Sequence, residues 1–128
     1  MKRQWHAACG LILISGLVLT TLSWAADPKH PERDPNFQKN HPRQTEVLKR
    51  VDRERHRINQ EYKQGKITAQ QRDQMLSQVH SIRQEDYADA KANSTNGTVR
   101  GGYITKDQQR VMNQQENQIN KEIRQAGH

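Results

Sequence analysis

Residues 65–71 read Gly-Lys-Ile-Thr-Ala-Gln-Gln, and residues 102–108 read Gly-Tyr-Ile-Thr-Lys-Asp-Gln. The two stretches share a Gly, an Ile, a Thr and a Gln at the same places, and they begin 37 positions apart. The same offset aligns four further pairs: Met75 with Met112, Gln78 with Gln115, Ile82 with Ile119 and Glu85 with Glu122. A repeat of this length is typical of a duplicated helical unit. It predicts two equivalent corners between helices.

Each stretch carries the signals of one helix ending and another beginning. Thr is a good N-cap residue, and a Gln three positions later can reach back to the N-cap amide and complete a capping box. The Gly suits the left-handed position that follows a helix C-terminus. We therefore interpret eight residues as a helix-capping motif: Gly65, Ile67, Thr68, Gln71, Gly102, Ile104, Thr105 and Gln108.

Apolar residues recur at helical spacing on both sides of these corners. We predict a first helix from Thr45 to Gly65, a second after Thr68, and a third from Lys106 to about Arg124. An apolar stripe on one side of a helix has to be buried against another element. The simplest solution is an all-α fold, a small antiparallel arrangement of about three helices built from the duplicated 37-residue helix–turn–helix unit.

The apolar stripes also suggest a binding surface for a client protein or a dimer surface. The candidate residues for this surface are Val51, Ile58, Met75, Val79, Ile82, Met112 and Ile119. On the third helix, Val111 and Ile123 continue the stripe, and Gln115 and Glu116 stand where a further apolar residue would be expected. The sequence leaves open whether the partner is another protein or a second copy in a homodimer.

The chain begins with the features of an export signal. Lys2 and Arg3 precede the uncharged, apolar residues 7–22, and Ser23-Trp24-Ala25 offers small residues where a signal peptidase needs them. We predict a signal peptide over residues 1–25, cleaved after Ala25, and a periplasmic or secreted mature protein. The alternative is an uncleaved membrane anchor, but the apolar stretch is at the short end for a bilayer-spanning helix.

All four prolines of the chain fall in residues 26–43, among charges and amides. Such a composition buries too little apolar surface to offset the entropy of ordering. We therefore predict a disordered Pro-rich linker over residues 26–43 and a helical domain over residues 44–128. His30 and His41 are weak candidates for a metal-binding tail, but a metal site needs three or four ligands at fixed spacing. We expect no metal and no other cofactor.

Composition narrows the classes of function. The single Cys9 and both tryptophans precede the predicted cleavage site, so the mature chain has no disulfide and no thiol chemistry. Hydrophobic residues make up 31% of the chain, which predicts a thin core. No Ser lies in a Gly-x-Ser-x-Gly elbow, and neither His56 nor His80 has a second His one turn away. We predict that the protein is not an enzyme.

The repeated stretches also match the spacing of the second half of an EF-hand calcium loop. When Gly65 is placed at the invariant glycine of that loop, the positions that need carboxylates fall on amides and a tyrosine: Gln60, Tyr62, Gln64 and Gln71. The second stretch also lacks acids at these positions. We therefore expect degenerate, EF-hand-like corners that bind no calcium.

The net charge is +7, and +5 once Lys2 and Arg3 are removed. The first predicted helix is rich in basic residues: Lys49, Arg50, Arg53, Arg55, Arg57 and Lys63. Interleaved acids, scarce aromatic residues and export argue against nucleic acid as a partner. Lipid head groups or cell-wall polymers suit a modest positive charge better, as peripheral contact with an anionic envelope surface at most.

The stretches Ile67-Thr68-Ala69-Gln70-Gln71 and Ile104-Thr105-Lys106-Asp107-Gln108 resemble the Leu-Thr-x-x-Gln motif of the Spy/CpxP-type periplasmic proteins. The resemblance implies an all-helical exported chain that dimerises and acts as an ATP-independent chaperone or envelope-stress modulator. Roughly residues 48–124 are also similar to small uncharacterised exported proteins of proteobacteria with paired Gly-x-[Leu/Ile]-Thr motifs. The second similarity implies an architecture and an address, and it brings no activity.

From these observations we expect a non-enzymatic, exported helical binding protein that is chaperone-like or related to envelope stress. A metal- or anion-binding periplasmic protein is the first alternative. A structural module with no ligand is the second. A mature protein that is monomeric and does not slow the aggregation of an unfolded client would contradict the chaperone hypothesis.

Overall fold

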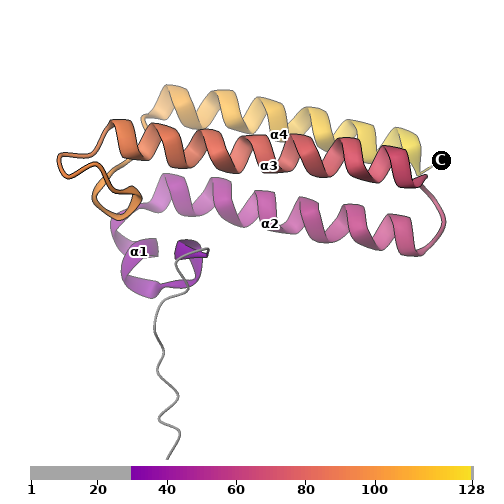
Figure 1. The fold of residues 1–128 in the computed structure, drawn as a ribbon, viewed down its shortest axis with the longest axis horizontal. Helices are drawn as coiled ribbons and strands as arrows, with labels where there is room; N and C mark the ends of the chain where they lie inside the picture. Colours follow the sequence, from indigo (N-terminus) through magenta and orange to yellow (C-terminus); the bar gives the residue numbers. More distant parts are fainter. Residues whose placement is uncertain (1–29, 128) are drawn as a thin grey trace, which may run out of the picture.

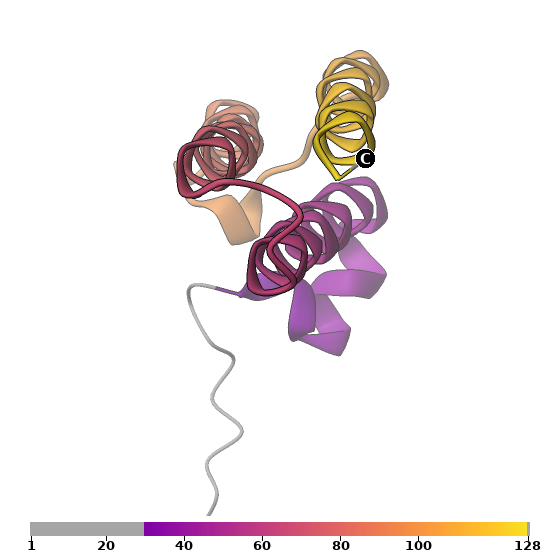
Figure 2. The ribbon, with the colours of Figure 1, turned by 90° about the vertical axis from the view of Figure 1, so that its right-hand side faces the viewer.

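The computed structural model describes residues 30–127. The predicted signal peptide therefore lies outside the described residues. Three long helices dominate the structure: α2 (Pro42–Lys63), α3 (Ala69–Ala92) and α4 (Lys106–Ala126). They run side by side in alternating directions, and each packs against the other two (Figures 1 and 2). The described part of the chain contains no strand, which confirms the predicted all-α antiparallel arrangement.

Two short helices precede α2 and fold back beside it (Figure 1). They are the 3-10 helix η1 (Pro31–Arg33) and α1 (Pro35–Asn40), and residues 30–41 are called the N-terminal clasp below. Asp34 caps α1 by accepting a hydrogen bond from the Asn36 amide at 2.9 Å.

The predicted disorder of residues 26–43 is wrong for residues 30–43. Here the prolines do not break helices, because Pro31, Pro35 and Pro42 each take the first position of one, where the backbone N–H has no intrahelical partner. Phe37 supplies the burial that the local composition lacks, since it is only 4% exposed. Residues 26–29 lie outside the described part of the chain.

The core lies between the three long helices. Its buried apolar residues are Val47, Val51, Ile58, Ile67, Met75, Val79, Ile82, Ala90, Ile104, Met112, Ile119 and Ile123. Val111 was expected in this stripe, but it is 44% exposed. No helix within residues 30–127 combines the length and the apolar character needed to cross a membrane.

The corner between α2 and α3 closes as the sequence predicts. Gly65 has a φ of +71° and follows the C-cap residue Gln64. Its N–H donates to the Tyr62 carbonyl at 2.9 Å, and the Lys66 N–H donates to the Glu61 carbonyl at 3.0 Å. These two bonds form a complete Schellman motif, which satisfies carbonyls at the end of α2.

Both predicted capping boxes are present and have the same geometry. Thr68 Oγ1 accepts from the Gln71 amide at 3.2 Å, and Gln71 Oε1 accepts from the Thr68 amide at 2.8 Å. Thr105 and Gln108 repeat these bonds at 3.2 and 2.8 Å. The Ile before each Thr is buried, so both corners anchor a helix start in the core.

The glycines of the two corners do different jobs, although the repeat makes them equivalent. Helix α3 ends at Ala92, and a loop and the 3-10 helix η2 (Val99–Gly101) separate it from Gly102. Gly102 therefore does not end a long helix, and its φ of −103° is open to any residue. It is buried against the Ala90 carbonyl oxygen, where a Cβ would collide. The predicted helix-end role is right for Gly65 and wrong for Gly102.

Candidate anion-binding site

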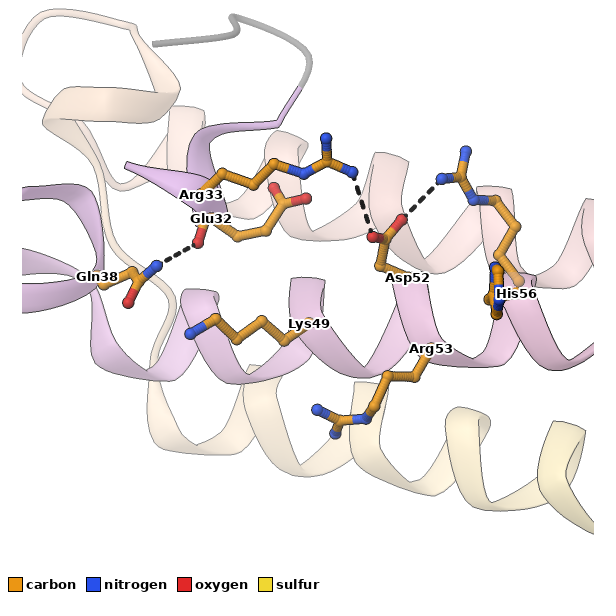
Figure 3. Close-up of a pocket in the computed structure, with 8 residues that line it drawn as sticks. Glu32, Arg33, Gln38, Lys49, Asp52, Arg53 and His56 are labelled. Atoms are coloured by element: carbon orange, nitrogen blue, oxygen red, sulfur yellow. Dashed lines mark hydrogen bonds and ion pairs between the residues drawn. The ribbon is translucent and has the colours of Figure 1, made fainter. Parts of the chain in front are cut away.

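A pocket of about 730 Å³ opens between the N-terminal clasp and the outer side of α2 (Figure 3). Its lining residues are Glu32, Arg33, Gln38, Lys49, Asp52, Arg53, Arg55 and His56. We call it the basic pocket. Residues 49, 53 and 56 follow one another at about one helical turn, so they share a side of α2. The Gln38 side chain donates to the Glu32 carbonyl at 2.8 Å and ties α1 to η1.

Asp52 is the centre of the ion pairs in the basic pocket. Its carboxylate lies 2.9 Å from an Arg55 nitrogen, 3.5 Å from an Arg33 nitrogen and 3.8 Å from Arg83 of α3. Figure 3 shows the Arg33 side chain reaching from the clasp towards Asp52. The side chains of Arg33 and Arg55 are 59% and 51% exposed, and ion pairs at this exposure contribute about 0–1 kcal/mol. Both guanidiniums can therefore turn towards a competing anion at little cost.

Glu32 is the buried acid of the clasp. It is 2% exposed, and its Oε1 lies 2.8 Å from His30 Nδ1 and 3.5 Å from an Arg83 nitrogen. Its Oε2 is buried and has no hydrogen-bond partner among the described residues. The contact with Arg83 ties the clasp to α3 as well as to α2.

Lys49 and Arg53 are the two cations of the basic pocket that form no ion pair among the described residues. Within residues 30–127, neither side chain has a hydrogen bond or ion pair, whereas Arg33 and Arg55 share Asp52. Their charged ends extend away from Asp52 in Figure 3. The pocket lining therefore has two cations without an ion pair in the described part of the chain, although Arg53 also opposes the rise in the pKa values of the buried acids Glu54 and Glu116.

One cluster in the described part of the chain has the donor types of a metal site, namely His30, Glu32 and Asp52. Candidate ligand atoms from these residues lie within 4.8 Å of one another. However, the guanidiniums of Arg33, Arg55 and Arg83 already contact the same two carboxylates. A divalent ion would have to displace them against a local excess of positive charge, so the arrangement favours an ion-pair cluster.

The two histidines named as weak metal candidates are in different settings. His30 belongs to the cluster just described. His41 stacks on Phe37, with ring centroids 4.5 Å apart, and its Nδ1 is buried without a hydrogen-bond partner among residues 30–127. The structure therefore gives the pair no shared site.

The residues predicted to form an apolar binding or dimer surface lie in the core instead. Val51, Ile58, Met75, Val79, Ile82, Met112 and Ile119 are each at most 4% exposed. The prediction is wrong because three long helices pack into one bundle, and each helix buries its stripe against its two neighbours. These side chains are not available to a client or a second copy in this fold.

A second polar site, between α2 and α4, was not predicted. Arg50 donates to the side-chain oxygens of Asn113 at 3.1 Å and Asn117 at 3.0 Å, and its Nε lies 2.8 Å from Glu116 Oε2. Glu116 is fully buried. Burial raises its pKa to about 8, although the nearby Arg50 opposes the shift. The sequence offered a signal, because Glu116 stands at an apolar position of the helical stripe.

Two more buried carboxyl groups face α2 or belong to it. Asn120 donates to Glu54 at 2.6 Å, and Gln44 donates to Asp86 at 2.8 Å. Burial raises the pKa of each acid to about 7, and these hydrogen bonds and neighbouring arginines only partly offset it. Asp86 is 0% exposed, although an acidic residue on a helix usually lies on a solvated face. The repeat contains the missed signal, because Asp86 aligns with the apolar Ile123.

Comparison of the chain with protein-family models, with curated proteins and with solved structures found no match. The resemblance to Spy/CpxP-type proteins therefore stays a prediction. Among the described residues, the basic pocket is the site whose geometry points most clearly to a ligand.

Proposed function

We propose that this chain is a non-enzymatic, exported binding protein that uses the basic pocket and the outer face of α2 to bind anionic head groups of an envelope membrane. The observation that carries the proposal is the pair of unpaired cations, Lys49 and Arg53, at a pocket that also contains two weakly held guanidiniums.

On the exposed face of α2, Lys63 adds a cation beyond the basic pocket. Lys49, Arg53, His56 and Lys63 are exposed and recur along one side of the helix. The interval from 49 to 63 is about 21 Å at 1.5 Å per residue, long enough to touch several head groups. Each Lys or Arg close to an anionic bilayer contributes about 1 kcal/mol to attraction. Peripheral binding of this kind needs no membrane-spanning helix.

A charge-reversal experiment tests this proposal. The mature protein is mixed with vesicles of phosphatidylcholine, with and without phosphatidylglycerol, and the bound fraction is measured by sedimentation. We expect binding only to the anionic vesicles, and weaker binding as salt is raised. The K49E/R53E variant is expected to bind at least roughly 30-fold more weakly, since two contacts of about 1 kcal/mol are lost.

A matched control separates the site from the net charge. Lys91 and Lys121 are exposed on α3 and α4, and they do not line the basic pocket. The K91E/K121E variant changes the net charge by the same amount as K49E/R53E. Equal weakening by both double variants, or equal binding of the wild-type protein to neutral vesicles, would overturn the proposal.

A further inference from the structure

The loop between α3 and η2 contains the one asparagine of the chain that is followed by glycine, Asn96-Gly97. Three donors surround the Asn96 Oδ1 atom. Ser94 Oγ lies 2.6 Å away, Thr98 Oγ1 lies 2.7 Å away, and the Thr98 backbone N–H lies 3.2 Å away. The backbone donor identifies the amide atom at this place as the oxygen, because a side-chain NH₂ could not accept from it.

The direction of the two hydroxyl bonds is also fixed by their other partners. Ser94 Oγ accepts from the backbone amides of Asn96 at 3.3 Å and Thr98 at 3.4 Å. Thr98 Oγ1 accepts from the Gly101 amide at 3.2 Å. Since each oxygen already accepts from the main chain, its own proton is free to point at Asn96 Oδ1. All three contacts therefore withdraw electron density from the Asn96 side-chain carbonyl.

The backbone nitrogen of Gly97 can attack the Asn96 side-chain carbonyl carbon, with the Asn96 NH₂ group as the leaving group. Neither of these two groups is engaged within the described residues. The Gly97 N–H donates no hydrogen bond there, and neither does the Asn96 NH₂ group. Gly97 has a φ of +66° and no Cβ, so it has no side chain of its own to shield its nitrogen from Asn96. Gly101 lies directly behind the Asn96 amide, and a Cβ there would collide with it.

We propose that Asn96 is a site of spontaneous covalent modification, at which the loop itself assists formation of a succinimide. Water or hydroxide removes the Gly97 amide proton, and the nitrogen attacks Asn96 Cγ. The NH₂ group takes up a proton from water, the Cγ–Nδ2 bond breaks, and ammonia leaves. Water opens the ring at either carbonyl and gives aspartate or isoaspartate at position 96. The three donors stabilise the charge that develops on Oδ1 during the attack, as an oxyanion hole does.

The product also fits the loop. An aspartate at position 96 presents a carboxylate oxygen to the same three donors, and hydrogen bonds to a charged acceptor are stronger than those to an amide oxygen. The modification therefore adds one negative charge to the corner between α3 and α4 without removing a hydrogen-bond partner from Ser94 or Thr98. The isoaspartate form adds a backbone methylene before η2.

The test measures the rate at which Asn96 reacts in the folded protein at neutral pH. Mass spectrometry follows the loss of ammonia with the addition of water, and chromatography separates the aspartate and isoaspartate forms. The reference is a free peptide of residues 93–99. We expect the folded loop to react faster than the peptide, and S94A and T98V each to slow the reaction by about tenfold, the effect of losing one hydrogen bond. The matched control T98S keeps the hydroxyl and is expected to keep the rate.

The alternative role of these hydrogen bonds gives the opposite result. If they only restrain the Asn96 side chain, the folded protein reacts more slowly than the peptide, and S94A and T98V accelerate the reaction. Either outcome overturns the proposal. Circular dichroism of each variant shows whether the helices are retained, and S94A leaves the Thr98 cap of η2 in place, so a folding defect in T98V does not decide the test.

Discussion

The buried acids are the residues that set this bundle apart from a plain apolar core. The repeat aligns Glu116 with Val79 and Asp86 with Ile123, so each acid occupies a place that is apolar in the other half. Arg50 is the cation nearest to Glu116, and it also satisfies Asn113 and Asn117. A charge-bearing side chain thus adds polar contacts between α2 and α4 to the apolar packing of the core.

We expect Arg50→Met to be strongly destabilising at about pH 9, where Glu116, whose pKa is raised to about 8, carries its charge. The substitution keeps the aliphatic stem but leaves Glu116 in the core without its cation, and breaking one partner of a buried pair costs about 3–5 kcal/mol. Urea denaturation monitored by circular dichroism measures the loss. In a Glu116→Gln background the same substitution is expected to cost clearly less, because no charge is stranded. An unchanged cost in that background would show that Arg50 acts through packing alone.

At the scale of helices and corners, the two repeat glycines give contrasting predictions. The Cβ added by Gly65→Ala has no atom within 4 Å. The substitution therefore costs only the backbone strain of a φ of +71°, about 1–2 kcal/mol. Gly102→Ala forces the Ala90 carbonyl to move and is expected to cost more than Gly65→Ala. Thermal unfolding of the two variants measures the difference. A larger loss at Gly65 would mean that the second corner yields easily.

The corners also show how much of the fold can be predicted from the sequence. Local signals were sufficient for Gly65 and for both capping boxes, because each bond joins residues a few positions apart. They failed for residues 30–43, where the first-position prolines are acceptable in helices and Phe37 becomes buried only through contacts that the local composition does not reveal. The predicted role of Gly102 was wrong for the same reason, because Gly102 contacts Ala90, which lies on the other side of a loop.

The candidate site was partly predictable. The basic residues of α2 are visible in the sequence, but their meeting with the clasp is not, because Glu32 and Arg33 were assigned to a disordered linker. The apolar stripes were identified correctly as helical faces and assigned wrongly to an outer surface. The stripes alone could not show that each of the three long helices would bury its stripe against the other two.

At the scale of the whole molecule, the three buried acids predict an unusual pH dependence of stability. Glu54, Asp86 and Glu116 have ordinary pKa values of 4.5, 3.8 and 4.5, and burial raises these to about 7, 7 and 8. Between these limits the folded state binds more protons than the unfolded state. The contribution of these three groups to the free energy of unfolding is therefore complete below their unfolded pKa values. It is lost as the pH rises through the folded pKa values of about 7 to 8.

We expect the free energy of unfolding to be highest near about pH 5 and to fall towards alkaline pH. Urea midpoints measured across this range at constant ionic strength test the prediction. The combined variant Glu54→Gln, Asp86→Asn and Glu116→Gln removes the titrating groups, so its stability should be much less dependent on pH. A wild-type stability that rises between pH 6 and 8 would contradict the raised pKa values, in which burial has the leading part.

The clasp has a thermodynamic consequence for the basic pocket. One wall of the pocket is Glu32, Arg33 and Gln38, and the other is a stretch of α2. A ligand that touches both walls favours the docked clasp by RT ln(1 + [L]/Kd), and a clasp that detaches lowers the ligand's affinity by the same free energy. Docking and binding are two sides of one linked equilibrium. Because the chain ahead of residue 30 joins the clasp directly, any pull on that end is opposed by whatever the pocket holds.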